Sequence, residues 1–485
     1  MSRQRLFRCW PVAACASAVV LLATGCAHQV APAAPPVAAE RAPAAPAVPK
    51  ELPAWVELGP TAIVRTLVEH DAACPTLSVD GQALPTRLRV AAGAAAQRPS
   101  EDQPATFPFD VCEAALPAGA HAPRLGERVL APVAAEPRRI VVLGDTGCRL
   151  KGAASQDCND PVAWPFAQVA RAAAAVHPDL VIHVGDYHYR ETPCPLADEG
   201  CAGSPWGYGW DAWDADFFTP AAPLLAAAPW IFVRGNHEEC ARAGQGWFRL
   251  LAPEPWTPER SCQRPGDDAE ADFSAPYAVP LGTSTQLIVF DSAHAGNRPL
   301  DLSRPGDAAI HARYVAEMRA LDALASPDRR SWFASHHPVL GFAPDDHPGA
   351  TRPYPGNAPL QQAMAEVNGT VYFPPGVQAA LHGHVHLFQA LAFEDGHPAT
   401  FVAGNGGDLS DSPLPDPLPP GTSPAPGVRL AQTTYSDLFG FLLMERADDD
   451  GRWTVTAHRR DGAEMTRCTL APDGRLACTP HGWLH

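Results

Sequence analysis

A pattern repeated after residue 138 restricts the fold more than any other feature of the sequence. Short apolar runs end abruptly, and a polar side chain follows each of them. The stretches 162–176 and 308–324, which lie between runs, have the composition of helices. Alternating buried strands and helices predict an α/β domain, and such domains bind ligands at the carboxyl ends of their strands. The runs are 139–143, 180–184, 230–233, 286–290 and 331–334, and the polar residues after them are Asp145, Asp186, Asn236, Asp291 and His336.

Five short blocks, four of which follow these runs, carry the candidate chemistry. A single block is weak evidence, since a Gly-Asp after a strand is ordinarily a turn or a helix cap. Together they offer two carboxylates, one amide oxygen, three imidazoles and one phenol, a ligand set that suits iron, manganese and zinc. Two such ions about 3.5–4 Å apart can stabilise the attacking and leaving oxygens of a phosphoryl transfer. The blocks are Gly144-Asp145-Thr146-Gly147, Gly185-Asp186-Tyr187-His188-Tyr189, Gly235-Asn236-His237-Glu238, Ser335-His336-His337-Pro338 and Gly383-His384-Val385-His386.

These blocks resemble the calcineurin-like metallophosphoesterases, and one detail narrows the resemblance. That superfamily usually opens with Asp-x-His, whereas Gly147 occupies the His position here. The second block instead offers Tyr189, three residues after Asp186. Gly-Asp-x-Gly together with Gly-Asp-x-x-Tyr resembles the purple acid phosphatase pattern, and a phenolate is a hard ligand that favours Fe(III). The resemblance covers residues 138 to 407.

The resemblance implies two metal ions that share one carboxylate. The first is expected to be Fe(III), and the second a divalent ion of iron, zinc or manganese. The expected ligands are Asp145, Tyr189 and His386 for the first ion, Asn236, His336 and His384 for the second, and Asp186 for both.

The resemblance also implies a reaction and two substrate-facing histidines. The reaction is hydrolysis of a phosphoester, on a small molecule or a protein, by a metal-bound hydroxide. His237 would contact the phosphate or assist the leaving group, and His347 lies roughly where the family carries another substrate-facing histidine. General acid catalysis of this kind is typically worth about 10²–10⁴-fold.

Several neighbouring residues have alternative interpretations. His188 could replace Tyr189 as a ligand, although the spacing favours Tyr189. His337 is expected beside the site or in a loop rather than on a metal. Glu238 is expected to orient His237 or a turn. His384 and His386 lie two apart, so a strand would aim both at one face, whereas a turn would let each serve a different ion.

Two rival functions remain open at this level. One is a phosphodiesterase or nucleotidase of the same superfamily, with two divalent ions and no tyrosine ligand. The other is a catalytically silent module that keeps the metal site as a structural clip. The formal net charge of -17 argues against a broad nucleic-acid footprint, which needs clustered Lys and Arg. The oligomeric state is not predicted.

The N-terminus indicates export. Arg3, Arg5 and Arg8 precede a short apolar run, as in a secretory signal of about 25 residues. The run ends in Leu22-Ala23-Thr24-Gly25-Cys26, which resembles a bacterial lipoprotein box with Cys26 as the lipidated residue. We therefore expect a protein anchored by lipid in the bacterial cell envelope, periplasmic or at the outer membrane. Simple cleavage and secretion is the alternative.

The cysteines support an oxidising compartment. Of the 13 cysteines, two lie in the expected signal and Cys26 is assigned to the lipid, which leaves an even number for disulfides. No C-x-x-C pair occurs, so thiolate metal ligands are disfavoured. Neighbours along the chain suggest the pairs Cys74 with Cys112, Cys148 with Cys158, Cys194 with Cys201, Cys240 with Cys262, and Cys468 with Cys478.

Four segments are therefore expected. Residues 1–25 form the signal, and residues 26–50, rich in Ala and Pro, form a tether. Residues 51–137 form a small β-rich domain, because short alternating runs are separated by turn signals there. Residues 138–485 form the catalytic domain. The resemblance implies that this domain is a metallophosphoesterase-type β-sandwich flanked by helices, an αββα arrangement of four layers.

Overall fold

The computed structural model describes residues 51–485 apart from 100, 118, 326–328 and 448–450. The expected signal, tether and Cys26 lie outside the described residues. Among the helices that are described, none has both the length and the hydropathy needed to cross a bilayer. Residues 51–485 form one compact unit.

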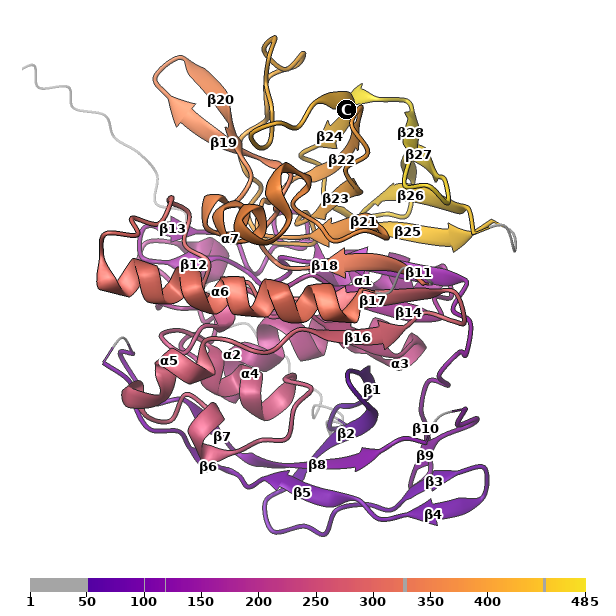
Figure 1. The fold of residues 1–485 in the computed structure, drawn as a ribbon. Helices are drawn as coiled ribbons and strands as arrows, with labels where there is room; N and C mark the ends of the chain where they lie inside the picture. Colours follow the sequence, from indigo (N-terminus) through magenta and orange to yellow (C-terminus); the bar gives the residue numbers. More distant parts are fainter. Residues whose placement is uncertain (1–50, 100, 118, 326–328, 448–450) are drawn as a thin grey trace, which may run out of the picture. The chain divides into compact units, whose positions relative to one another are not determined.

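One sheet of eleven strands forms the first half of the framework (Figure 1). Its central strands β11, β14 and β15 run parallel to one another. In spatial order the strands are β28 (Leu476–Thr479), β27 (Glu464–Leu470), β26 (Trp453–Arg459), β25 (Gly440–Arg446), β11 (Arg139–Leu143), β14 (Leu180–His183), β15 (Trp230–Phe232), β1 (Ala54–Leu58), β2 (Ala62–Glu69), β8 (Phe109–Ala115) and β5 (Arg87–Val90).

A second sheet of eight strands forms the other half. Its strands β17, β18, β21 and β23 are parallel. In spatial order the strands are β16 (Tyr277–Pro280), β17 (Thr285–Val289), β18 (Arg330–Ala334), β21 (Val377–His382), β23 (Ala399–Ala403), β22 (Phe388–Phe393), β24 (Leu430–Ser436) and β29 (Gly482–Trp483).

The two sheets pack face to face through alternate side chains of their strands. Val142 of β11 and Ile182 of β14 join a buried cluster that also contains Leu287 of β17 and residues of β18, β21 and β23. Trp332 of β18 meets Trp453 of β26 edge to face, with ring centroids 4.8 Å apart. Period-two alternation therefore buries one face of each sheet against the other.

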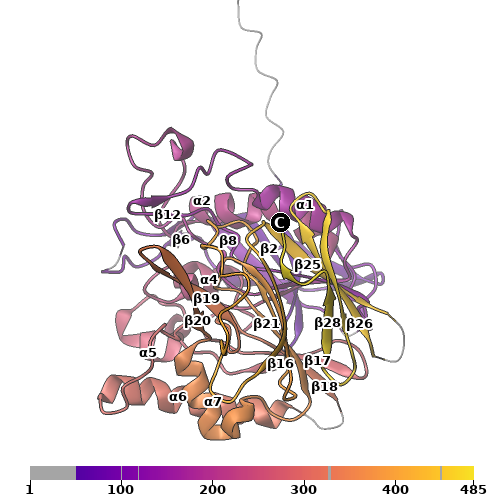
Figure 2. The same cartoon turned by 90° about the horizontal axis from the view of Figure 1, so that it is seen from above.

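Helices cover the two outer faces. Helices α1 (Phe166–Ala175) and α3 (Thr219–Ala227) pack on the first sheet, where Val141 shares a cluster with Phe166. Helices α6 (Pro305–Leu324) and α7 (Ala358–Asn368) pack on the second, where Tyr314 and Leu360 join Phe333. Figure 2 shows α1 on one side of the strands and α6 and α7 on the other. The expected αββα order is confirmed.

The N-terminal β-rich region continues the first sheet. Strand β1 pairs in parallel with β15, and β2, β8 and β5 extend the sheet from it. Arg65 is fully buried there, with its Nη1 2.7 Å from Glu57 Oε2 and 2.9 Å from the carbonyl oxygen of Leu250, the last residue of α4 (Gly244–Leu250). The first sheet thus contains strands from before and after residue 137. The domain boundary expected at this residue stays a prediction.

The remaining elements are short. A four-stranded sheet joins β10, β9, β3 and β4, and three hairpins pair β6 with β7, β12 with β13, and β19 with β20. Their bounds are β3 (Leu77–Val79), β4 (Gln82–Leu84), β6 (Gly93–Ala94), β7 (Thr106–Phe107), β9 (Arg124–Leu125), β10 (Arg128–Val129), β12 (Leu150–Lys151), β13 (Ala154–Ser155), β19 (Phe342–His347), β20 (Ala350–Pro355), α2 (Trp210–Trp213), α4 (Gly244–Leu250) and α5 (Asp268–Ala271).

Five disulfides close local loops of the chain. Each joins the neighbours that the sequence suggested, with separations of 7 to 38 residues. Two of them, Cys148–Cys158 and Cys194–Cys201, share a small buried cluster with Leu150. These bonds hold the loops that follow β11 and β14, the strands that lead into the candidate site.

Candidate metal centre

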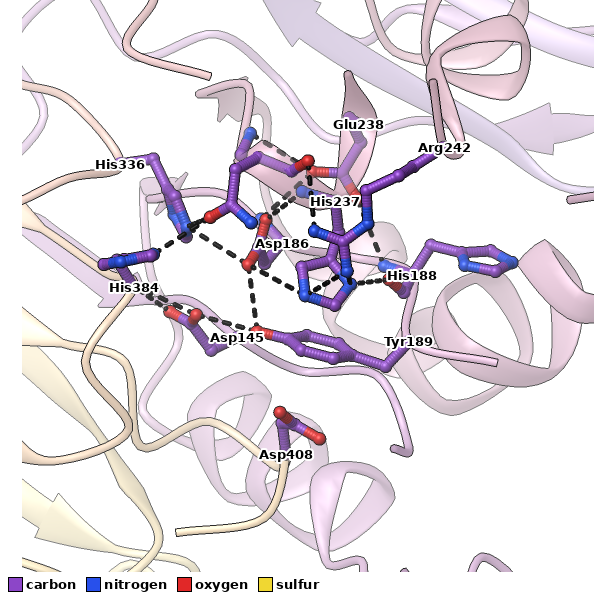
Figure 3. A network of polar contacts seen from close by, with 12 residues as sticks. Asp145, Asp186, His188, Tyr189, His237, Glu238, Arg242, His336, His384 and Asp408 are labelled. Atoms are coloured by element: carbon purple, nitrogen blue, oxygen red, sulfur yellow. Dashed lines mark hydrogen bonds and ion pairs between the residues drawn. The ribbon is translucent and has the colours of Figure 1, made fainter. Parts of the chain in front are cut away.

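The predicted ligands meet where parallel strands of both sheets end. Asp145 follows β11, Asp186 follows β14, and Asn236 follows β15. From the second sheet, His336 follows β18, and His384 lies in the turn between β21 and β22. Figure 3 shows the side chains of Asp145, His336 and His384 converging around Asp186. Two sheets therefore contribute ligands to one point at their common carboxyl edge.

Three of these residues have a backbone conformation that side chains rarely adopt. The φ angles of Asp145, Asp186 and His384 are 56°, 57° and 68°. Left-handed non-glycine residues cost of order 1–3 kcal/mol and cluster at functional sites. A Cβ at Gly383 would lie 2.5 Å from Asp145 Oδ2, so only glycine allows this approach. The abrupt turns aim the carboxylates inward.

The phenol of Tyr189 occupies the first half of the site. Its Oη lies 3.0 Å from Asp145 Oδ1, from Asp186 Oδ2 and from His386 Nε2. A hydroxyl carries one proton, so it can donate only one of these three contacts. Such a convergence of oxygen and nitrogen donors fits a cation better than it fits hydrogen bonding alone.

Two imidazoles and an amide form the second half. Asn236 Oδ1 lies 3.1 Å from His336 Nε2 and 2.9 Å from His384 Nδ1. His336 Nε2 is also 3.1 Å from Asp186 Oδ2. One donor atom each from Asp186, His336 and His384 lies within 4.8 Å of the others. Asp186 contacts both halves, as a shared ligand would.

The outer nitrogen of each imidazole is fixed by an acceptor. His336 Nδ1 donates to the carbonyl oxygen of Val184 at 2.9 Å, and His386 Nδ1 to that of Leu409 at 2.8 Å. His384 Nε2 donates to Asn297 Oδ1 at 3.2 Å. An imidazole that binds a metal is neutral, and with the proton on these outer nitrogens the other nitrogen of each ring would offer its lone pair to an ion at the site. The residues thus fit a pair of bound metal ions.

The charges of this site are strongly coupled. Burial alone would raise the pKa of Asp186, but the imidazoles of His336 and His237 outweigh it and hold that pKa well below its usual range. Burial would lower the pKa of His386, yet the nearby carboxylates of Asp408 and Asp145 raise it to about 10. Positive charge at the centre is therefore favoured by the acids around it.

Two acids that were not predicted as ligands shape the loop after β14. Glu238 Oε1 accepts from the backbone N–H groups of Tyr187 at 2.9 Å and His188 at 3.2 Å, and Oε2 accepts from that of Asp186 at 3.2 Å. This agrees with its expected role in a turn. Asp216 Oδ2 accepts from the backbone N–H of Tyr189 at 2.7 Å. No motif in the sequence surrounds Asp216.

His237 belongs to a second cluster beside Asp186. Its backbone N–H donates to Asp186 Oδ1 at 2.8 Å. Its Nδ1 lies 3.1 Å from Glu191 Oε1, and Glu191 pairs with Arg242. Burial and the positive charge of Arg242 lower the pKa of His237 to about 3. Neither Glu191 nor Arg242 was predicted, although Glu191 lies only two residues after Tyr189.

Asp408, another acid that was not predicted, lies behind His386. Asp408 Oδ2 is 3.2 Å from His386 Nδ1 and pairs with Arg149, whose guanidinium lies 4.9 Å from the ring centroid of Tyr189. Asp408 follows a glycine-rich loop after β23. A polar residue after a strand end was the signal that could have identified it.

Three further histidines of the described residues have other contacts. His188 Nε2 donates to the carbonyl oxygen of Gly207, and the ring of His337 packs 4.1 Å from that of His384. His347 ends β19, is half exposed and bonds Asp345 Oδ2 at 2.9 Å. The structure does not bring His347 to the predicted ligands, so its role stays a prediction.

The chain's place among known proteins agrees with this site. Residues 138–388, just over half of the chain, match the model of the calcineurin-like phosphoesterase family. The chain belongs to that family. It is accordingly a metal-dependent phosphoester hydrolase with a dinuclear metal centre and a phosphoester substrate.

A solved structure shows a similar fold. A purple acid phosphatase from seeds of yellow lupin (Lupinus luteus) aligns with a TM-score of 0.52 at 14% identity, over 86% of this chain and 74% of that one. PhoD aligns with a TM-score of 0.47 at 11% identity, over 89% of this chain and 92% of that one. No curated sequence matches the chain.

The structure gives a reason for glycine at position 147. A Cβ there would lie 2.8 Å from Asp216 Oδ2 and from the carbonyl oxygen of Tyr187, and 3.0 Å from Tyr189 Cδ2. The Tyr189 ring and the turn that supports it therefore fill the space a side chain would need. Glycine at 147 and tyrosine at 189 depend on each other sterically.

Gly147→Ala is expected to displace Tyr189 and to lower the metal content of the purified protein. The cause is the close approach of its Cβ to the ring and to Asp216. Gly306→Ala is the matched control, because a Cβ at Gly306 meets no atom within 4 Å. Metal per chain, measured by plasma mass spectrometry, checks this. Equal metal content in both variants would contradict the steric argument.

Proposed function

We propose that this chain is an exported phosphatase whose two-metal site works in the manner of the purple acid phosphatases. The observation that carries the proposal is the position of the Tyr189 hydroxyl, 3.0 Å from Asp145, Asp186 and His386 at once. A site for two divalent metal ions without a tyrosine ligand would not need a phenol at this position. It would also not need glycine at position 147 to make room for the phenol.

The ligands divide as the resemblance implies. Fe(III) would take the phenolate site, a divalent ion the site of two imidazoles and an amide, and Asp186 would be shared. When bound, such a pair supplies a water-derived nucleophile at neutral pH and neutralises charge on the phosphoryl oxygens. The ligands are Asp145, Tyr189 and His386 for Fe(III), and Asn236, His336 and His384 for the divalent ion.

The chain's own groups then act on the substrate. His237 is positioned by Glu191 and by the bond from its backbone to Asp186, so its ring is held at the edge of the centre. We assign it to contact with the phosphate or to assistance of the leaving group. Arg242, fixed by Glu191, adds positive charge beside it. This would favour an anionic substrate despite the acidic net charge.

Export is supported by the five disulfides, which persist in oxidising compartments. An anchor at Cys26 is part of the proposal and rests on the sequence alone. Membrane contact would then occur through the lipid, with the catalytic unit outside the cytoplasm.

Asp186→Ala is expected to abolish hydrolysis of phenyl phosphate, because both metal sites lose their shared carboxylate. The loss should exceed the roughly 10–100-fold typical of outer-shell partners. Asp473→Ala, an exposed acid paired with Arg475, is the control. Release of inorganic phosphate measures the rate, and circular dichroism checks folding. Equal rates in wild type and Asp186→Ala would favour the silent module.

The oxidised protein is expected to show a visible tyrosinate-to-iron charge-transfer band that Tyr189→Phe lacks. The substitution removes only the hydroxyl oxygen that lies between Asp145 and Asp186. Tyr354→Phe, on the half-exposed ring of β20, should keep the band. Absorption spectra of the three proteins, each with its iron content, check this. A colourless oxidised wild type would favour the rival with two divalent ions.

His237→Ala is expected to lower kcat for phenyl phosphate by about 10²–10⁴-fold, the range typical of a positioned side chain that acts on the leaving group. His347→Ala should have a much smaller effect, because His347 bonds Asp345 at 2.9 Å on an exposed hairpin. Steady-state kinetics at matched metal content distinguish the two. A loss of kcat in His347→Ala as large as in His237→Ala would place both in the catalytic site.

A further inference from the structure

A cavity of about 230 Å³ adjoins the metal centre at the base of the β19–β20 hairpin. Phe342, Ala343 and Pro344 of β19 line one side of it, and Tyr354 of β20 lines another. Asn297 and His384 complete the wall toward the metal centre. The cavity is thus built from a hairpin that carries none of the predicted metal ligands.

The ring of His384 separates the cavity from the metal centre. Its Nδ1 faces Asn236 Oδ1 at 2.9 Å, on the side of the ligands. Its Nε2 faces Asn297 Oδ1 at 3.2 Å, on the side of the cavity. A phosphoester held at the centre can therefore extend its alcohol portion past His384 into the cavity.

Several polar side-chain groups that line the cavity are already engaged by the protein. The Tyr354 hydroxyl donates to the carbonyl oxygen of Asn297 at 3.2 Å. Asn357 Nδ2 donates to the carbonyl oxygen of Gly296 at 3.0 Å, while its Oδ1 accepts from Leu360 at 3.0 Å. What remains for a guest is mainly the surface of prolines and of the Tyr354 ring, since Phe342 is buried beneath the cavity wall. Such a lining favours apolar and aromatic groups.

Charge restricts the guest further. No Lys or Arg is among the described residues that line the cavity, and Asp345 is its one acid. A second phosphate or a carboxylate on the guest would face this acid without a cation to pair with it. Size sets the upper limit, since a dry cavity of about 150 Å³ holds one benzene ring.

We propose that this cavity is a leaving-group subsite, which selects phosphomonoesters of uncharged aromatic alcohols with one or two rings. The inference rests on the proposed phosphatase function and adds its substrate class. The β19–β20 hairpin then determines which alcohol portion is accepted, whereas hydrolysis depends on the residues at the strand ends.

Three esters of similar alcohol acidity test the subsite: benzyl phosphate, 4-carboxybenzyl phosphate and glycerol 3-phosphate. The metal-loaded wild type should hydrolyse benzyl phosphate with the highest kcat/KM. Ala343→Phe should fill the cavity and lower kcat/KM for benzyl phosphate by about 10-fold or more, because hydrophobic pockets discriminate by such factors. Glycerol 3-phosphate should be far less affected. Tyr354→Ala, at a half-exposed position, removes one wall and should also weaken the benzyl preference.

Charge reversal gives a matched pair of variants. Asp345→Lys should raise kcat/KM for 4-carboxybenzyl phosphate relative to benzyl phosphate. Asp346→Lys changes the next residue of β19, which does not line the cavity, and should leave that ratio as in the wild type. Equal ratios in both variants, or equal losses on benzyl and glycerol esters in Ala343→Phe, would overturn the subsite. A wild type that hydrolyses none of the three would instead overturn the phosphatase function itself.

Discussion

The carboxylate of Asp186 is the constraint on which the rest of this structure depends. One oxygen lies 3.0 Å from the Tyr189 hydroxyl and 3.1 Å from His336, so it joins ligands from the two sheets. The backbone of Asp186 has a φ of 57°, and Glu238 accepts hydrogen bonds from the backbone N–H groups of Asp186 and Tyr187. A carboxylate reaches two neighbouring cations only if its loop cannot relax. The fold therefore stores strain at this turn and holds it with buried hydrogen bonds.

The same logic explains why so many acids surround a site for an anionic substrate. Asp145, Asp186 and Asp408 lie beside the basic groups of His386, His336 and Arg149, and two bound metal ions would add the positive charge that attracts an anionic substrate. Positive charge from Arg242 is kept beside His237 by Glu191. The net charge of -17 thus describes the whole chain, whereas the sign of the local charge at the metal centre depends on the ions bound there.

The sequence predicted most of what is local and little of what is long-range. Abrupt strand ends indicated the predicted ligands, and the structure brings these side chains together at one edge of the two sheets. Gly147 stands where the superfamily usually has a histidine, and Tyr189 offers a ligand in its place. Both residues lie in the short blocks after the strands, so the difference could be seen in the sequence. Asp216 and Asn297 were missed, since each acts from a loop without a motif. The pairing of β1 with β15 joins segments more than 170 residues apart and leaves no local pattern.

Hydrolysis and substrate selectivity depend on different parts of the fold. The predicted metal ligands lie at the ends of strands that are buried on both faces, so a change there disturbs the core. The β19–β20 hairpin lies between β18 and α7 and has mostly exposed or half-buried residues. Its side chains can change with little effect on packing, yet its base borders His384. Variation in this hairpin would alter which alcohol is accepted, while the geometry around Asp186 stayed the same.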